Sequence, residues 1–291
     1  MLITTTDDLA RFCDALRGAP YIAVDAEFLR EKSYYAQLCL VQVAYGEHAA
    51  AIDPLAEGID MGPLAALLRD PNTVKVLHSA TQDLEIFLAK LGGVPGPVFD
   101  TQIAASVCGL GSQPGYAKLV EAVVGVSIDK GPQATDWSIR PLTDRQLAYA
   151  LSDVTHLCDV YEHLLAELER TGRAAWVKEE MEALLNPDRY RTAPREAWRR
   201  VRIRRPSRKA LGALRELAAW REETAMHRNT PRGWVVRDEA LVEIATSLPE
   251  TVDALARVRK LSGAVAKGRD GEALLAAVQA ALALDPEERP E

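Results

Sequence analysis

The sequence lacks a long apolar run and contains few cysteines. Although 48% of its 291 residues are hydrophobic, no run approaches the ~18 to 20 apolar residues that cross a membrane. Its first residues hold no basic stretch followed by an apolar core, which argues against a secretory signal. The cysteines form no CxxC pair, so buried free thiols in a reducing cytoplasm are expected instead of a zinc site. These four cysteines are Cys13, Cys39, Cys108 and Cys158.

Positive charge is concentrated in one segment of an otherwise acidic chain. The net charge is −7, yet residues 189–209 hold ten Lys or Arg and one acid, Glu196. An acidic protein with one basic segment favours a polyanion contact confined to that segment. A solvated linker or an exposed helix face explains the same charge equally well.

Apolar runs separated by turn residues predict two different parts. Strand-like runs at 21–28, 38–45, 49–52, 73–77 and 98–99 alternate with helical segments, which indicates an α/β domain with a mixed five-stranded sheet and flanking helices. Short connections between the first three runs favour antiparallel neighbours. After an arginine- and proline-rich segment the pattern is helical throughout. We therefore expect an α/β domain at 1–186, a basic linker at 187–206 and a small all-α domain at 207–284.

The first strand carries two carboxylates at its end. Asp25 and Glu27 are two residues apart, and side chains at i and i+2 of a strand lie on one face. Two such carboxylates repel each other, and desolvation adds to the cost. A hard divalent cation with a preference for oxygen ligands relieves that repulsion. Taken alone, the pair is better explained by a strand end that turns into solvent.

A third acid follows a strand near residue 78. Ser79 and Gln82 fit a capping box, which places Asp83 in the first turn of a helix. The positive end of the helix dipole favours an acid there, so Asp83 taken alone is an ordinary first-turn residue. It becomes a ligand candidate only if this helix begins beside the strand that carries the first two carboxylates.

A second capping box, formed by Thr143 and Gln146, predicts the start of a long helix. Tyr149 and Asp153 are then i and i+4 on one face of this helix. Such a pair is common by chance. Beside a carboxylate cluster, however, a phenol can orient a water molecule next to a metal-bound carboxylate.

These motifs together resemble ribonuclease D. The resemblance lies in Val-Asp-Ala-Glu-Phe at 24–28, Val-Leu-His-Ser-Ala-Thr-Gln-Asp-Leu at 76–84 and Tyr-Ala-Leu-Ser-Asp-Val at 149–154, with Asp-Lys at 129–130 and Thr-Asp-Trp-Ser-Ile-Arg-Pro-Leu at 135–142 between them. Residues 220–222, 229–231 and 235–238 are similar to the helicase-and-RNase-D C-terminal (HRDC) domain. The resemblance covers nearly the whole chain, and its specificity lies in the combination of motifs.

The resemblance implies a ribonuclease-H-like exonuclease fold of the tyrosine DEDD subclass, followed by an HRDC helical domain. It assigns two divalent metal ions, Mg²⁺ with Mn²⁺ as a substitute, to Asp25, Glu27, Asp83 and Asp153, with Asp83 acting through water. Tyr149 positions the nucleophilic water. The implied reaction is 3′-to-5′ hydrolysis of RNA 3′ ends, with tRNA precursors as substrates, release of nucleoside 5′-monophosphates and action as a monomer. Relatives often carry two HRDC domains, whereas this chain ends after one, so a short form and a truncated piece both stay open.

Five further residues are candidates for contacts with substrate. Phe28 either stacks on the terminal base or packs in the core. His78 either touches the terminal nucleotide or is an ordinary buried histidine. Gln102, Lys130 and Arg140 are candidates for contacts with phosphate or sugar.

Two rival functions use the same features. One is an inactive nucleic-acid-binding module, which the complete set of four carboxylates and one tyrosine argues against. The other is a 3′-to-5′ DNA exonuclease of the proofreading or repair type. The pairing with an HRDC-like domain favours RNA.

Overall fold

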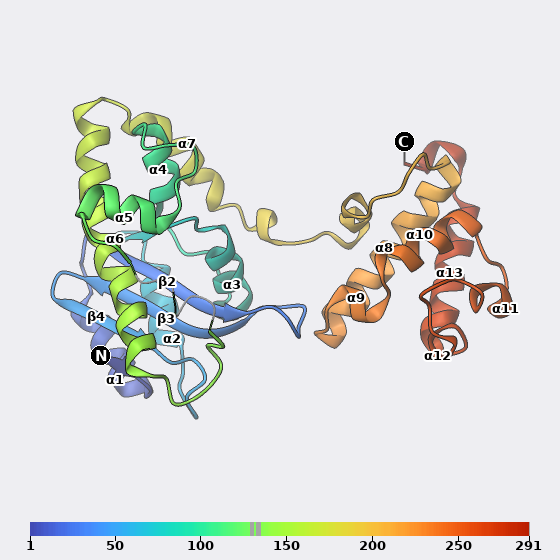
Figure 1. Cartoon of the computed structure of the whole chain (residues 1–291), viewed down its shortest axis with the longest axis horizontal. Coiled ribbons are helices and arrows are strands. Elements are labelled where there is room, and N and C mark those ends of the chain that lie inside the picture. Colours follow the sequence, from blue (N-terminus) through green and yellow to red (C-terminus); the bar gives the residue numbers. More distant parts are fainter. Residues whose placement is uncertain (129–130, 132–134, 291) are drawn as a thin grey trace. The chain divides into compact units, whose positions relative to one another are not determined.

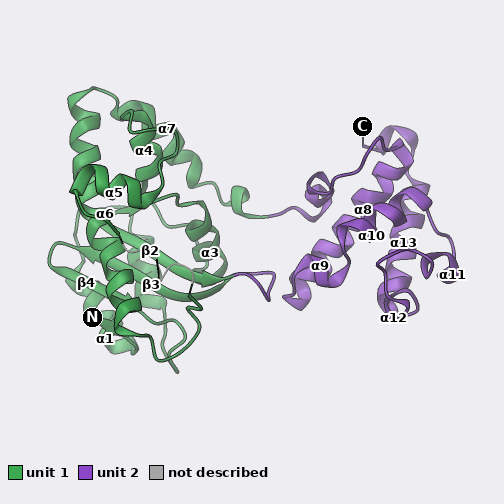
Figure 2. Cartoon of the chain, viewed as in Figure 1, with its two compact units in different colours: residues 1–29, 36–191 green, residues 30–35, 192–291 purple. Residues whose placement is uncertain are grey.

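The computed structural model describes residues 1–128, 131 and 135–290, which form two compact units (Figure 2). The first unit comprises residues 1–29 and 36–191, and the second comprises residues 30–35 and 192–291. The division after residue 191 falls inside the segment that the sequence suggested as a linker. No described helix is long and apolar enough to cross a membrane.

Strands and helices alternate in the first unit, whereas the second unit is helical (Figure 1). The strands are β1 (Leu2–Ile3), β2 (Tyr21–Leu29), β3 (Gln37–Tyr45), β4 (His48–Ile52), β5 (Val74–Leu77) and β6 (Val98–Asp100). The helices of the first unit are α1 (Thr6–Ala15), α2 (Gly62–Leu68), α3 (Thr81–Leu91), α4 (Thr101–Val107), α5 (Tyr116–Val124), α6 (Asp144–Arg170), α7 (Ala174–Leu184) and the 3₁₀ turn η2 (Pro187–Tyr190). Those of the second unit are η3 (Pro194–Arg200), α8 (Arg208–Arg228), α9 (Arg232–Val235), α10 (Asp238–Ser247), α11 (Val252–Leu255), α12 (Gly263–Ala266), α13 (Arg269–Ala283) and η4 (Pro286–Glu288).

The described strands form one mixed sheet in the order β1-β4-β3-β2-β5-β6. β2, β3 and β4 pair antiparallel, as their short connections predict. β5 and β6 continue the sheet in parallel beyond β2. The expected count of five strands was one too low, because the two-residue β1 pairs with β4 and is too short to show a period. The α/β class with a mixed sheet is confirmed.

Helix α6 packs across the middle of this sheet. It contacts β2, β3, β4 and β5. Its buried apolar positions Val154, Leu157, Tyr161, Leu164 and Leu168 recur every three or four residues, which is the period of one helix face. Full burial of such a side chain contributes roughly 1.5 to 3 kcal/mol. The hydrophobic face of α6 therefore fixes the helix against β2, the strand that carries the two carboxylates.

One of the two predicted capping boxes is confirmed. Thr143 and Gln146 form it at the start of α6. The box predicted at Ser79 is wrong: α3 begins at Thr81 without a side-chain cap. Ser79 has a φ of 57°, and the carboxylate of Asp100 accepts hydrogen bonds from the backbone amides of Ser79 at 3.0 Å and Ala80 at 2.8 Å. The end of β6 therefore holds the turn that leads into α3, and no described side chain caps the helix itself.

The second unit includes most of the segment that was expected to be a linker. Ala197 and Val201 are buried, and Trp198 packs against the core of the helical unit. Within the same unit, the Tyr34 hydroxyl hydrogen-bonds Glu222. The guanidinium of Arg232 lies 5.0 Å from the Tyr34 ring centroid. No feature of the sequence assigned residues 30–35 to this unit.

Candidate active site

The carboxylates from the first strand and the long helix converge on one cleft. Each of Asp25, Glu27 and Asp153 offers an oxygen, and these oxygens lie within 4.8 Å of one another. The cleft has a volume of about 340 Å³, and Asp83 and Tyr149 also line it. All five residues predicted to carry the chemistry are therefore brought together. Asp83 lies beside the group of three and is not part of it.

Three different local structures position these side chains. Alternation along β2 places Asp25 and Glu27 on one face. Asp83 is buried in the first turn of α3, where the partial positive charge of the helix N-terminus favours a carboxylate. Tyr149 and Asp153 lie one turn apart on α6. Their approach to β2 follows from the packing of α6 across the sheet.

An irregularity in β2 explains how Phe28 reaches the same cleft. Strict alternation would direct Phe28 away from Glu27, but the register with β3 shifts between these two residues. Such bulges bend a strand and redirect the next side chain. Phe28 lines the cleft and also packs against the hydrophobic core. The structure therefore shows the core packing of Phe28, and its stacking on a terminal base stays a prediction.

The electrostatics of the cleft indicate a deficit of positive charge. Burial, followed by the charges of Asp25, Asp153 and Asp83, raises the pKa of Glu27 to about 9. Burial and the charge of Asp25 also raise the pKa of Asp153, to about 7. Burial raises the pKa of Asp25 as well. Three acids held this closely are stable as anions only with a cation among them.

The donor set suits a hard divalent cation. Every oxygen in the group of three belongs to a carboxylate, which is the ligand type that Mg²⁺ and Mn²⁺ prefer. The buried Oδ1 of Asp153 has no hydrogen-bond partner in the described part of the chain. A buried carboxylate oxygen without a donor is costly. Coordination of an ion would satisfy it, so these residues fit the metal that the fold implies.

Tyr149 remains protonated beside this cluster. Burial, the charge of Asp153 and a hydrogen bond to Asp153 all raise the pKa of the Tyr149 phenol. The hydroxyl is therefore a donor at neutral pH. The Trp137 ring, which is 1% exposed, lies with its centroid 6.2 Å from that of Tyr149. A packed core on one side and the carboxylates on the other define the position of the phenol.

Tyr116 was not identified from the sequence as a residue of the cleft. Tyr116, in the first turn of α5, lines the cleft, and its hydroxyl donates to the backbone carbonyl of Asp153. This contact fastens α5 to the turn of α6 that presents the carboxylate. No spacing in the sequence relates Tyr116 to Asp153, because the two residues meet only through the packing of two helices.

The other candidates for contacts with substrate do not all lie in the cleft. His78 lines the cleft, with Nδ1 3.0 Å from the Thr101 hydroxyl, and burial lowers its pKa, so the ring is neutral. The Gln102 amide donates to the Pro114 carbonyl at 3.2 Å, and Gln102 does not line the cleft. Lys130 lies outside the described residues.

Arg140 does not line the cleft either. Its guanidinium binds Asp53 and three backbone carbonyls. The expected phosphate contact is therefore corrected to an internal one, because the donors that a phosphate would need are already engaged.

Comparisons with known proteins match both units of the chain. Residues 1–169 match the family model described as 3′-5′ exonuclease, and residues 210–278 match that of the HRDC domain. Ribonuclease D of Gluconacetobacter diazotrophicus is 49% identical over 98% of this chain and 72% of its own length. The crystal structure of Escherichia coli RNase D matches 100% of this chain and 77% of its own, with a TM-score of 0.89 and 39% identity.

A more distant structure, Brucella melitensis NrnC with bound Mg²⁺, matches 60% of this chain and 86% of its own, with a TM-score of 0.53 and 30% identity. The exonuclease model alone spans more than half of the chain, and the ribonuclease D match extends over both units. The cleft with its four carboxylates lies inside the part matched by the exonuclease model. The chain therefore belongs to the ribonuclease D family of 3′-to-5′ exoribonucleases.

Proposed function

We propose that this protein shortens structured RNAs such as tRNA precursors from the 3′ end, acting as a cytoplasmic monomer that uses two Mg²⁺ ions and releases nucleoside 5′-monophosphates. The observation that carries the proposal is the convergence of Asp25, Glu27 and Asp153, with a protonated Tyr149 beside them. A buried group of acids with raised pKa values is typical of a site that works with a bound cation.

Each side chain has a defined task in this proposal. Asp25, Glu27 and Asp153 hold the metal, and Asp83 acts through water. Bound divalent ions supply positive charge for the attacking and leaving oxygens of the phosphodiester. Tyr149, protonated and hydrogen-bonded to Asp153, orients the attacking water.

Two residues that line the cleft form its proposed nucleotide subsite. Phe28 offers an aromatic ring to the terminal base, and stacking of this kind tolerates any sequence. The neutral His78 adds a polar ring without placing a further charge next to the carboxylates.

Relatives support the choice of substrate and metal. Escherichia coli RNase D is described as an exoribonuclease involved in structured RNA processing, and the NrnC structure contains Mg²⁺. In this chain, the arginines of residues 189–209 offer positive charge for an RNA backbone. Positive charge attracts the phosphates of both nucleic acids, so the proposal of RNA over DNA rests on the Escherichia coli relative.

Digestion of matched 3′-tailed RNA and DNA tests the proposal. We expect stepwise shortening of the RNA in Mg²⁺, nucleoside 5′-monophosphates as products, and no reaction after chelation. Asp25→Asn should abolish hydrolysis and leave the circular dichroism spectrum unchanged. Faster digestion of DNA would favour the rival DNA exonuclease. RNA binding without hydrolysis by the wild-type protein would favour the inactive binding module.

A further inference from the structure

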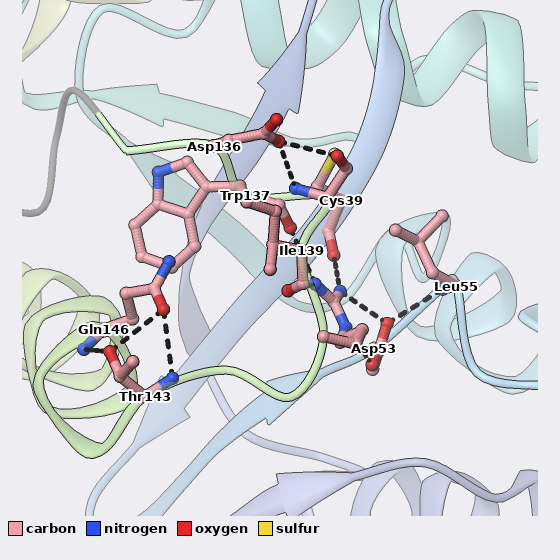
Figure 3. A network of polar contacts seen from close by, with 10 residues as sticks. Cys39, Asp53, Leu55, Asp136, Trp137, Ile139, Thr143 and Gln146 are labelled. Atoms are coloured by element: carbon pink, nitrogen blue, oxygen red, sulfur yellow. Dashed lines mark hydrogen bonds and ion pairs between the residues drawn. The ribbon is translucent and has the colours of Figure 1, made fainter.

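Arg140 donates a hydrogen bond from every N–H of its guanidinium. Figure 3 labels the four residues that accept these bonds, Cys39, Asp53, Trp137 and Ile139. Its Nε and Nη2 donate to the two carboxylate oxygens of Asp53 at 2.6 and 2.7 Å. Nη2 also donates to the carbonyl of Cys39 at 2.7 Å, and Nη1 donates to those of Trp137 at 2.7 Å and Ile139 at 2.9 Å. A guanidinium has five N–H donors, so all of them are engaged.

The network joins segments that are far apart in the sequence. Asp53 directly follows β4 and is only 4% exposed. Its backbone amide donates to the carbonyl of Ile3 at 2.9 Å, and its Oδ1 accepts from the amide of Leu55 at the same distance. Cys39 belongs to β3. Arg140 therefore fastens the segment that leads into α6 to two strands of the sheet.

The same segment contains Trp137, the aromatic residue that packs beside the phenol of Tyr149. Trp137 lies three residues before Arg140, and Thr143, the cap of α6, lies three residues after it. Trp137 packs in a small hydrophobic cluster, and Tyr149 packs against this cluster. The buried members of this cluster are Cys39, Leu40, Ala51, Trp137, Leu142 and Ala150. A shift at Arg140 would thus be transmitted to the first turns of α6 and to the Tyr149 ring.

We propose that Arg140 and Asp53 form a positioning pair that sets the place of Tyr149, and hence of the water that Tyr149 orients. The bidentate geometry fixes both distance and angle, which a single ammonium contact cannot do. Neither residue touches substrate. The pair acts through Trp137 and the start of α6. This inference rests on the proposed function of Tyr149.

The proposal predicts a change in turnover without a change in substrate binding. In Arg140→Lys the positive charge remains and the fork is lost. We expect kcat on RNA to fall about tenfold, because small misplacements of reacting groups are costly, while KM stays within about twofold. Arg11→Lys, an exposed arginine paired with Asp8 in the same unit, is the matched control and should leave both constants unchanged. A raised KM with unchanged kcat would overturn the proposal in favour of a phosphate contact.

A double-mutant cycle separates positioning from general support of the fold. If Arg140 acts through Tyr149, Arg140→Lys should reduce kcat little further in a Tyr149→Phe background. Multiplicative losses would overturn the proposal. Asp53→Asn, which removes the charge and keeps the shape, should give the same non-additive result and serves if Arg140→Lys folds poorly.

Hydrogen exchange gives a readout that does not depend on activity. In Arg140→Lys we expect faster exchange of backbone amides at 146–150, with the C-terminal turns of α6 still protected. Uniform exchange changes along α6, or none, would overturn the proposal. A wild-type protein that fails to hydrolyse RNA would instead refute the proposed function, so the two failures are distinguishable.

Discussion

Gln42 lies directly opposite Asp25 in the antiparallel ladder of β2 and β3. Its side chain is fully buried, and neither atom of its amide group has a hydrogen-bond partner in the described part of the chain. Side chains that face each other across a ladder share one face of the sheet, with Cβ atoms about 4.5 to 5.5 Å apart. A polar group is thus kept, at a cost, beside the first carboxylate of the active site.

Gln42→Leu should therefore raise stability and lower activity. Removal of an unpaired buried amide should increase the free energy of unfolding by about 1 kcal/mol. The loss of a polar neighbour of Asp25 should decrease kcat. Urea denaturation and single-turnover hydrolysis of RNA measure the two effects, with Gln37→Leu at an exposed position of the same strand as the control. A less stable variant with normal kcat would contradict this expectation.

Glu27→Gln should stabilise the protein when divalent ions are removed. Burial and the neighbouring acids raise the pKa of Glu27 to about 9, so its ionised form opposes folding at neutral pH. Loss of that charge should add about 1 to 3 kcal/mol to the free energy of unfolding in a chelator. The same variant should lose most of the stabilisation that Mg²⁺ gives the wild type. Thermal melts with and without Mg²⁺ test both points. The exposed Glu47→Gln should behave like the wild type.

Lys75→Met should destabilise the first unit without altering the chemistry. Lys75 is fully buried, and its ammonium donates to the carbonyls of Asp70 at 2.7 Å, Thr73 at 2.6 Å and Gly96. Hydrogen bonds of charged groups contribute about 1.5 to 3 kcal/mol each, and the carbonyls left behind are partly buried. We expect a loss of about 2 to 4 kcal/mol in chemical denaturation, with normal kcat per folded molecule. The exposed Lys118→Met is the control.

Two arginines of the helical unit are candidates for the RNA backbone. Arg200 and Arg237 line a cleft of about 530 Å³. The acids of this cleft are already paired with cations: Glu222 with Arg232, Asp238 with Arg221 and Glu239 with Lys260.

Replacement of Arg200 and Arg237 by Gln should weaken RNA binding. The slope of log affinity against log salt should fall by about 0.7 for each lost phosphate contact. Binding isotherms of the Asp25→Asn form at several salt concentrations measure the slope, and Arg257→Gln, outside the cleft, is the control. An unchanged slope would leave Arg200 and Arg237 without a role in binding RNA.

Local rules predicted which of the candidate side chains share a face within one element, because these residues sit in regular structure. The period of two along β2 relates Asp25 to Glu27, and the helical period relates Tyr149 to Asp153. The capping box at Thr143 fixes where that second period begins. The mixed sheet followed from the lengths of runs and connections.

Interactions between segments that are distant in the sequence could not be predicted by the same local rules. Ser79 does not cap α3, and the Asp100 carboxylate at the end of the neighbouring strand instead binds the amides of the turn before this helix. The sequence made Arg140 a candidate for a contact with phosphate or sugar, and only the fold shows that Asp53 engages it. The turn at 30–35 carries no signal for the helical unit, since its hydrogen-bond partners, Glu222 in α8 and Asn229 directly after α8, lie about 190 residues later.

The repulsion within the carboxylate group also bears on how the protein folds. Asp25 and Glu27 stand in an early strand and Asp153 in a late helix, so the group closes only when long-range contacts form. Because the carboxylates repel one another, bringing them together early does not stabilise a folding intermediate. A cation that binds the closed group stabilises the native state after the rate-limiting step, and such stabilisation slows unfolding while leaving folding rates nearly unchanged. The metal that serves catalysis would then also slow the unfolding of the native protein.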